Sequence, residues 1–305
     1  MLYTVFDDFT TDFEELKKRN NEVVRVLRND WLLSHDVADK IAECGSFLGF
    51  HIGANENGEV GKPQLVAANF CRQKLCPTCQ KRKSLKMFAN TLKVCEYLER
   101  YEVKYIHLVL TVPNCRGGEA LVGTIKKLYR DFGKFYHYKE TARVFKGCLR
   151  CLEITYNAEN STFHPHLHCL IAVNKSYFNS RYYLTYDRLR GLWQSACRSD
   201  KPYQISVGAI RGDVAKGVAE VCKYCVKPLD LDEVGEAHAQ YVYSTLGTVL
   251  KGQRAVQKYG LIKEAYKALD LKDEDEDEAA TPPPAGQVLY FRYNKDTGKY
   301  RSVEK

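Results

Sequence analysis

Three histidines recur at every second position in the segment FHPHLHCLIAV, as His164, His166 and His168. Successive side chains of a β-strand point to opposite faces, so a strand here would place all three imidazoles on one face. Imidazole is the commonest metal-binding side chain, and three rings this close together favour a shared cation. The spacing therefore predicts a metal site. The alternative is an exposed, histidine-rich strand that binds nothing.

A carboxylate is expected beside these imidazoles. The segment RCLEITYN is joined to the histidine segment by the polar turn NAENST, which predicts an antiparallel hairpin. If Leu152 and Ile154 face the core, Glu153 lies on the histidine face. One carboxylate with two or three imidazoles suits Mn²⁺ or Mg²⁺ in a phosphoryl-transfer site, or Zn²⁺. His107, alone on a neighbouring predicted strand, is interpreted as a structural residue or as one that supports the ligands.

A tyrosine lies on the polar face of a helix predicted over 213–227, which Pro228 stops. Tyr224 follows Glu220 by one turn and is flanked by Lys223 and Lys227. A phenol normally titrates at about 10, and nearby ammonium groups favour its ionised form, a nucleophile. Glu220 is placed to act as a base or to hold a water. The alternative is an amphipathic helix with a surface tyrosine, since the chain has 21 tyrosines.

Four cysteines suggest a second metal site. Cys76 and Cys79 form a C-x₂-C knuckle, the turn that lets two thiolates reach one tetrahedral Zn²⁺, and Cys71 and Cys44 could complete the set. The sequence predicts structural zinc, with buried free thiols as the alternative. A further C-x₂-C pair lies mid-helix at 222–225 without a partner pair, so we interpret both of its cysteines as packing residues.

The segment that follows Cys71 is rich in basic residues. Six of them, with no acidic residue between, could grip a DNA backbone: Arg72, Lys74, Lys81, Arg82, Lys83 and Lys86. Lys223 and Lys227, beside the predicted nucleophile, are further candidates for DNA contacts. The net charge of +8 includes an unbroken acidic run over 273–278, and without those six charges it would be 8 + 6 = +14. Such a surplus favours a polyanionic partner.

The remaining composition is that of a globular protein. The 305 residues allow one large domain or two small ones, and no run of about 18 uncharged apolar residues could span a membrane. The N-terminal stretch is acidic where a signal peptide would be cationic, so we expect a cytoplasmic protein with no membrane partner. Twelve cysteines in a reducing compartment favour thiols and metal ligands over disulfides.

Composition divides the chain into five stretches. We expect an N-terminal helical segment (1–40), a Cys-rich zinc module (41–84), a catalytic domain (85–270), an acidic, proline-containing disordered linker (271–286) and a C-terminal hairpin (287–305). Within 85–270 the hydrophobic periodicity predicts strands near 104–112, 149–156, 164–173 and 203–210, and helices near 119–138, 186–198 and 213–227. This βαββαβα order predicts an α+β fold with a ferredoxin-like (split βαβ) antiparallel sheet and packed helices.

These motifs together resemble the plasmid rolling-circle replication initiators of the HUH endonuclease superfamily, single-tyrosine type. The resemblance rests on four segments in family order over about 44–228: FCRQKLCPTCQKRKSLK, LEITYN, FHPHLHCLIAV and AEVCKYCVK. It implies a divalent metal, Mn²⁺ or Mg²⁺, on His166 and His168. It also implies that Tyr224 attacks a phosphodiester at the plasmid origin, giving a 5′-phosphotyrosyl link and a 3′-OH primer. Glu220 matches the glutamate thought to assist hydrolysis at termination.

The resemblance also implies binding partners, and three other classes of protein remain as alternatives. Single-stranded or cruciform origin DNA would be the substrate, with a host helicase and polymerase as partners; the oligomeric state is not implied. A single-tyrosine transposase or a relaxase shares the chemistry, but such a transposase is usually shorter and a relaxase usually carries its tyrosine before the histidines. A non-catalytic, zinc-stabilised DNA-binding regulator would explain charge and cysteines, but not the histidine strand.

Overall fold

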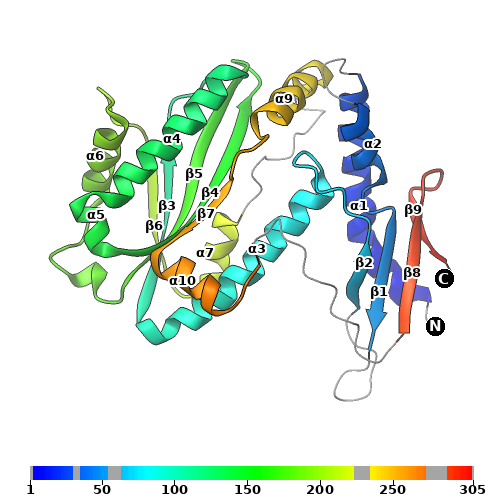
Figure 1. Cartoon of the computed structure of the whole chain (residues 1–305), viewed down its shortest axis with the longest axis horizontal. Coiled ribbons are helices and arrows are strands. Elements are labelled where there is room, and N and C mark those ends of the chain that lie inside the picture. Colours follow the sequence, from blue (N-terminus) through cyan, green and yellow to red (C-terminus); the bar gives the residue numbers. More distant parts are fainter. Residues whose placement is uncertain (1–2, 30–34, 54–62, 223–233, 273–286, 304–305) are drawn as a thin grey trace. The chain divides into compact units, whose positions relative to one another are not determined.

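The computed structural model describes residues 3–29, 35–53, 63–222, 234–272 and 287–303 (Figure 1). Contacts divide the chain into two compact units. The first comprises residues 1–82, 239–247 and 275–305, and the second 83–238 and 248–274. Each unit is built around its own antiparallel sheet, so the expected α+β class with packed helices is confirmed.

The second unit contains a five-stranded sheet in the order β6-β3-β5-β4-β7. Its strands are β3 (Val103–Thr111), β4 (Phe145–Asn157), β5 (Thr162–Asn174), β6 (Ile205–Ile210) and β7 (Val256–Tyr259). Every neighbouring pair is antiparallel. Strand β5 is therefore central and lies between β3 and β4, which run parallel to each other. The strand order follows from the chain path, because β5 turns back from β4 by a hairpin and fills the place beside β3.

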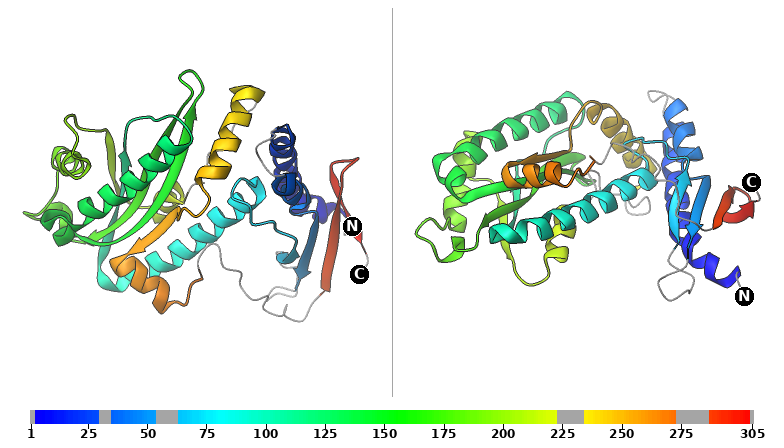
Figure 2. Two further views of the ribbon diagram at one scale, coloured as in Figure 1. Left: turned by 45° about the horizontal axis from the view of Figure 1, so that its top comes forward. Right: turned by 60° about the horizontal axis from the view of Figure 1, so that its bottom comes forward.

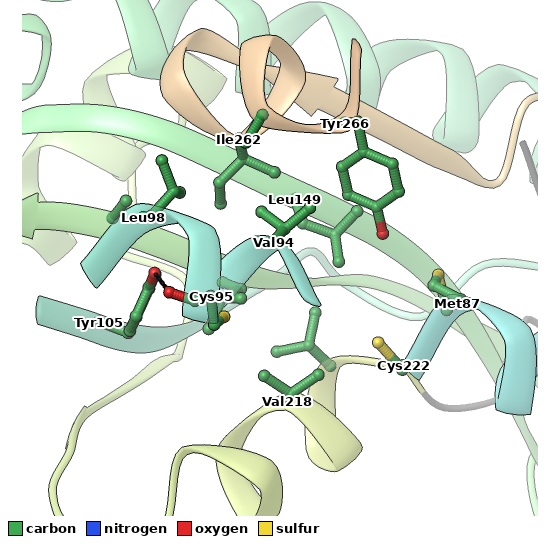
Figure 3. Close-up of a cluster of buried hydrophobic side chains, with 14 of the residues drawn as sticks. Met87, Val94, Cys95, Leu98, Tyr105, Leu149, Val218, Cys222, Ile262 and Tyr266 are labelled. Atoms are coloured by element: carbon green, nitrogen blue, oxygen red, sulfur yellow. Dashed lines mark hydrogen bonds between the residues drawn. The ribbon is translucent and has the colours of Figure 1, made fainter. Parts of the chain in front are cut away.

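Helices cover both faces of this sheet (Figures 1 and 2). One face carries α4 (Glu119–His137), α5 (Lys139–Val144) and α6 (Tyr186–Cys197), with Phe135 of α4 edge-on to Trp193 of α6 at 5.8 Å between ring centroids. The other face carries α3 (Pro77–Leu98), α7 (Val214–Val221) and α10 (Gly260–Ala268). A cluster of buried side chains packs these three helices onto β4 and β5 (Figure 3). Between the strands lie two short 3₁₀ turns, η1 (Glu99–Tyr101) and η2 (Tyr177–Asn179), and α9 (Glu236–Val249) precedes β7.

The first unit contains a four-stranded sheet in the order β2-β1-β8-β9. Its strands are β1 (Phe47–Ile52), β2 (Gln64–Ala68), β8 (Gln287–Asn294) and β9 (Lys299–Val303), and its helices include α1 (Tyr3–Arg28) and α2 (His35–Glu43). The C-terminal hairpin thus pairs with a strand about 240 residues earlier, Phe47 opposite Arg292. Leu48, Phe50 and Phe291 form its small core.

The Cys-rich stretch 41–84 also contains two strands, β1 and β2, for which the sequence made no prediction. Strand β1 buries four consecutive residues, Leu48 to His51, so it shows no alternation of polar and apolar side chains. Strand β2 has only five residues and none of them is buried. Neither strand therefore carries the period-two pattern by which strands are recognised.

The helix predicted over 213–227 is described as α7 only to Val221, with Cys222 as its C-cap and Asp213 as its N-cap. Asp213 accepts a hydrogen bond from the Lys216 N–H at 3.2 Å, a typical N-cap interaction. Residues 223–233, and with them Tyr224, Lys223 and Lys227, lie outside the described residues. So does most of the expected linker. None of the helices in the described ranges is both long and apolar enough to cross a lipid bilayer.

A substitution at Gly147 tests how closely α10 approaches the five-stranded sheet. A Cβ at this position would lie 2.7 Å from the backbone nitrogen of Ile262, which cannot move without shifting the helix. We expect Gly147→Ala to lower the free energy of unfolding by about 1–3 kcal/mol, measured by urea denaturation. Gly208→Ala in β6 is the matched control, because a Cβ there meets nothing within 4 Å. Equal stability of the two variants would show that the close approach is wrong.

Candidate metal centre

The histidine strand and its hairpin partner bring three metal-ligating side chains together. Register sets His166 of β5 opposite Glu153 of β4 and His168 opposite Cys151. One potential ligand atom from each of Glu153, His166 and His168 lies within 4.8 Å of the others. The Glu153 Oε2 atom is 3.0 Å from His166 Nε2 and 2.7 Å from His168 Nε2. The register thus produces the cluster that alternation along the strands predicts.

The two histidines are held by their other ring nitrogens. His166 Nδ1 is 3.1 Å from the backbone carbonyl of His164, so it carries the proton and donates it. His168 Nδ1 is 3.1 Å from His107 Nε2 on β3, and the two rings stack with centroids 5.3 Å apart. When His168 Nδ1 donates to His107, Nε2 of His168 is left with its lone pair. Such supporting hydrogen bonds commonly fix the tautomer of a metal-binding histidine.

The fit of a cation can be judged from the polar atoms in the cluster. Within the described part of the chain, His168 Nε2 is buried and has no hydrogen-bond partner of acceptable geometry, although Glu153 Oε2 is near. Burial favours the neutral carboxyl, but the adjoining imidazoles of His166 and His168 outweigh it and hold the pKa of Glu153 well below its ordinary range. An ionised carboxylate and two imidazole nitrogens within 4.8 Å of one another form a donor set that suits a divalent metal.

His164 lies beside this cluster rather than in it. Its ring centroid is 5.1 Å from that of His166, and its side chain is partly exposed. Burial lowers the pKa of His164, and the neighbouring His166 lowers it further, so its neutral form is favoured. His107, in contrast, contacts a ligand directly. The sequence marked it only as a possible supporting residue, because a single histidine on a strand carries no spacing signal.

Helix α7 lies on the same face of the sheet as the metal ligands. Val218 and Cys222 are buried in one cluster with Met87 (Figure 3). Val221 and Cys151 belong to the same cluster, and Cys151 is the residue opposite His168. The Ser84 hydroxyl donates to the carbonyl of Cys222 at 2.5 Å and fixes the end of the described helix. Cys222 therefore packs as expected for this residue. Glu220 is exposed on the opposite, polar side of the helix.

The four predicted cysteine ligands also come together. Cys44, Cys71, Cys76 and Cys79 each offer a sulfur within 4.8 Å of the others, and they form the second of two such clusters found among the described residues. The Cys79 sulfur is 3.6 Å from that of Cys44 and 3.8 Å from that of Cys71. Tetrahedral Zn–S bonds of about 2.3 Å would separate neighbouring sulfurs by about 3.8 Å. The geometry fits a single zinc ion.

Backbone N–H groups point at these sulfurs. The N–H of Arg72 donates to Cys79 at 3.2 Å, and that of Cys71 donates to Cys44 at 3.4 Å. Arg72 has a φ of 59°, which directs its N–H into the cluster. Hydrogen bonds from the thiols of Cys44, Cys71 and Cys76 hold the pKa of Cys79 well below its usual value.

Two residues of α1 pack against the cysteine cluster and were not predicted. Asn20 is fully buried, and its Oδ1 accepts from the Thr78 N–H at 3.3 Å and from the Cys76 thiol at 3.6 Å. Lys17 is 1% exposed, and its ammonium donates to the carbonyls of Ala42 and Cys44 at 2.6 and 3.2 Å. Both are separated from the cysteines by more than 20 residues in the chain. A single sequence gives no signal of such long-range contacts.

The basic residues predicted to bind DNA are described on both sides of the cysteine pair. Arg72 and Lys81 are exposed, whereas Lys74, Arg82, Lys83 and Lys86 are partly buried. The Arg82 guanidinium lies 4.7 Å from the centre of the Phe70 ring. All six therefore lie at or near the surface, although they differ in how much of the residue is exposed.

The geometry defines an α+β protein with a histidine–carboxylate cluster in the second unit and a four-cysteine cluster in the first unit. Comparison with known families agrees with this class. The profile of a family described as replication protein matches residues 62–295. The chain therefore belongs to the Rep family of plasmid replication initiators, as the sequence resemblance predicted.

Individual relatives support the same assignment. A protein named rep from a Bacillus species is 34% identical over 260 residues, which cover 78% of this chain and 82% of the relative. A protein rep from Staphylococcus aureus is 34% identical over 220 residues, covering 72% and 93%. A third, from Bacillus amyloliquefaciens, is 32% identical over 257 residues, covering 77% and 74%. No solved structure matches the chain significantly.

Proposed function

We propose that this replication initiator nicks one DNA strand at a plasmid origin, with Tyr224 as nucleophile and a divalent metal bound by Glu153, His166 and His168. One observation carries the proposal. The three ligands, of which His166 and His168 are buried, lie on the sheet face covered by α7, and that helix ends at Cys222, two residues before Tyr224 in the chain. Tyr224 lies outside the described residues, and its support is its place in the chain, two residues after Cys222.

The fold of the second unit supports this assignment. We infer a ferredoxin-like sheet from the order β6-β3-β5-β4, in which the strand that returns from the hairpin separates two parallel strands. This is the split βαβ arrangement, to which β7 adds an edge strand. A central strand is buried on both sides, so ligands placed on β5 are held rigidly between two neighbours. The fold supplies the rigidity, and the side chains supply the chemistry.

The reaction follows from the roles of these residues. The tyrosine oxygen forms a bond to phosphorus while the bond to the 3′ oxygen breaks, and the leaving oxygen gains the proton that the phenol loses. A free 3′-OH and a 5′-phosphotyrosyl ester result, so the energy of the cleaved bond is kept in a reversible link. Glu153, His166 and His168 hold the cation, and His107 orients His168. When bound, the metal neutralises charge that develops on the phosphate.

Glu220 is proposed to end the cycle. A carboxylate can take a proton from a water molecule that attacks the phosphotyrosyl ester, which releases the strand by hydrolysis. Glu220 lies on the exposed side of α7, where water can reach it. Glu220 comes four residues before Tyr224 in the chain.

The cysteine cluster is proposed to hold structural zinc in the first unit. Two of its ligands, Cys44 and Cys71, are 27 residues apart in the chain. One ion would therefore join the Cys71 segment to the end of α2, which α1 contacts through Lys17. We further propose that Arg72, Lys74, Lys81, Arg82, Lys83 and Lys86, with Lys223 and Lys227, contact the DNA backbone. The substrate is single-stranded or cruciform origin DNA, and the proposed setting is the cytoplasm, with a host helicase and polymerase.

The nucleophile is tested by trapping the covalent link. Wild-type protein incubated with a labelled single-stranded origin oligonucleotide and Mn²⁺ is expected to give an adduct that survives denaturing electrophoresis. Tyr224→Phe removes the attacking oxygen, so adduct should fall by more than about 1,000-fold. Tyr186→Phe, which removes an exposed hydroxyl elsewhere on the second unit, should leave it unchanged. A regulator without catalysis would shift the oligonucleotide in a native gel but leave no adduct with any variant.

The glutamate is tested by following the same adduct over time. Glu220→Ala should form it at the wild-type rate but release it more slowly, because hydrolysis lacks its base, so adduct accumulates. Glu119→Ala changes an exposed carboxylate on α4 and serves as the control. If adduct turnover in Glu220→Ala equals that of wild type, Glu220 has no part in termination.

The two metal sites are tested by reciprocal variants. His166→Ala should weaken Mn²⁺ binding by at least about 100-fold, measured by electron paramagnetic resonance, and leave zinc content unchanged. Cys79→Ser should lose most of the zinc found by elemental analysis and retain Mn²⁺ binding. Each variant is thus the control for the other. Undiminished Mn²⁺ affinity in His166→Ala would exclude the histidine cluster as the site.

A further inference from the structure

A basic cavity lies in the first unit, between α1 and the turn that follows β8. Its volume is about 420 Å³, and four of its lining residues are cations: Lys17, Arg25, Arg28 and Lys295. Asn21 and Tyr293 also line it, and no carboxylate does so among the residues the structure describes. Asn21, Arg25 and Arg28 recur at helical spacing, so they form one stripe along α1. None of these residues belongs to either metal cluster.

Two of the cations that line the cavity form ion pairs with carboxylates outside its lining. Arg28 pairs with Asp39 at 2.8 Å and Lys295 pairs with Glu43 at 2.7 Å. Both pairs have exposed side chains, and such surface pairs are weak and easily exchanged for another anion. Among the described residues, four cations and no carboxylate line the cavity. An anion that enters it therefore meets positively charged side chains from several directions.

Lys17 makes the cavity different from a patch of surface lysines. Its side chain is 1% exposed, it lines the cavity, and its ammonium lies 5.0 Å from the centre of the Tyr293 ring. An ammonium has three N–H donors. In the described ranges of the chain, Lys17 has two hydrogen-bond acceptors, the carbonyls of Ala42 and Cys44. One donor of a buried cation thus remains for a ligand in the cavity.

We propose that this cavity binds a phosphate group of the DNA backbone, as a contact separate from the nicking site. Phosphodiester oxygens accept hydrogen bonds from both guanidinium and ammonium groups, and Arg25 and Arg28 are one helical turn apart, so one phosphate can reach both. The cavity is large enough to hold a phosphodiester with its sugar, which needs more room than a single inorganic ion. Because the chain is a replication initiator, DNA is the phosphate source we favour over a free nucleotide. The inference does not require that Tyr224 cleave DNA.

The test uses the whole chain and a fluorescein-labelled 20-base-pair duplex of random sequence, titrated by fluorescence anisotropy over a series of NaCl concentrations. The double variant Arg25→Gln/Arg28→Gln should bind about tenfold more weakly at 0.1 M salt. The slope of log K against log salt should shrink by up to about 1.8, since each lost phosphate contact removes about 0.9. Arg25 and Arg28 are both exposed residues of α1, so the helix should tolerate the two substitutions.

Lys18→Gln/Arg19→Gln is the matched control. Both residues are exposed on the same helix, lie outside the cavity and carry the same total charge. The control should keep the wild-type slope and affinity within about twofold. If both double variants weaken binding equally, the effect is general electrostatics and the cavity is not a contact. Wild-type binding by Arg25→Gln/Arg28→Gln would overturn the proposal directly.

A second arm separates DNA from a free nucleotide. ATP at millimolar concentration, added in a thermal-shift assay, should not stabilise the wild type more than it stabilises Arg25→Gln/Arg28→Gln. The opposite result would be that ATP stabilises the wild type but not Arg25→Gln/Arg28→Gln, while this variant binds the duplex as tightly as the wild type. That result would assign the cavity to a free nucleotide and overturn the DNA contact. Since the duplex offers no single strand to nick, a chain that forms no covalent adduct still answers this question.

Discussion

The antiparallel pairing of β4 with β5 is the constraint on which the proposed chemistry depends. Side chains alternate between the two faces of a strand, so a slip of one residue in this pairing would send Glu153 to the opposite face from His166. The hairpin prevents such a slip because both strands bury residues on both sides. Leu152 opposite Leu167 fills the core beneath α4, and Leu149 opposite Leu170 fills the core beneath α3. The apolar residues thus fix the register, and the register brings the ligands together.

The two clusters differ in how much of them a sequence can reveal. Glu153, His166 and His168 come from adjacent strands joined by a short turn, so local alternation was enough to predict their meeting. The cysteine ligands also carry a local signal in the C-x₂-C pair at Cys76 and Cys79. The residues around them carry none, because Asn20 and Lys17 approach from a helix far away in the chain. His107 likewise gains its position only from the pairing of β3 with β5.

Strands were predictable where one face is polar and failed where that contrast is missing. The strands at 104–112 and 164–173 alternate clearly and appear as β3 and β5 within a few residues of the expected bounds. Strand β1 is buried at four successive positions, and β2 is short and solvated, so neither resembles a half-buried strand. The pairing of β1 with β8 joins segments about 240 residues apart, and no periodicity encodes a partner at that distance. Hydrophobic patterning specifies a face, whereas pairing is decided by the folded chain.

Helix α7 shows how packing can serve chemistry without taking part in it. Val218 and Val221 are fully buried against the sheet, which fixes the rotation of a helix of only eight residues. That rotation turns Glu220 to solvent, and the hydrogen bond from Ser84 to the Cys222 carbonyl fixes the point at which the chain leaves the helix. Since Cys222 packs in one cluster with Cys151, and Cys151 pairs with His168, that exit point is tied to the strand that bears the ligands. A substitution that loosened the two valines would therefore disturb the proposed nucleophile while leaving the metal ligands in register.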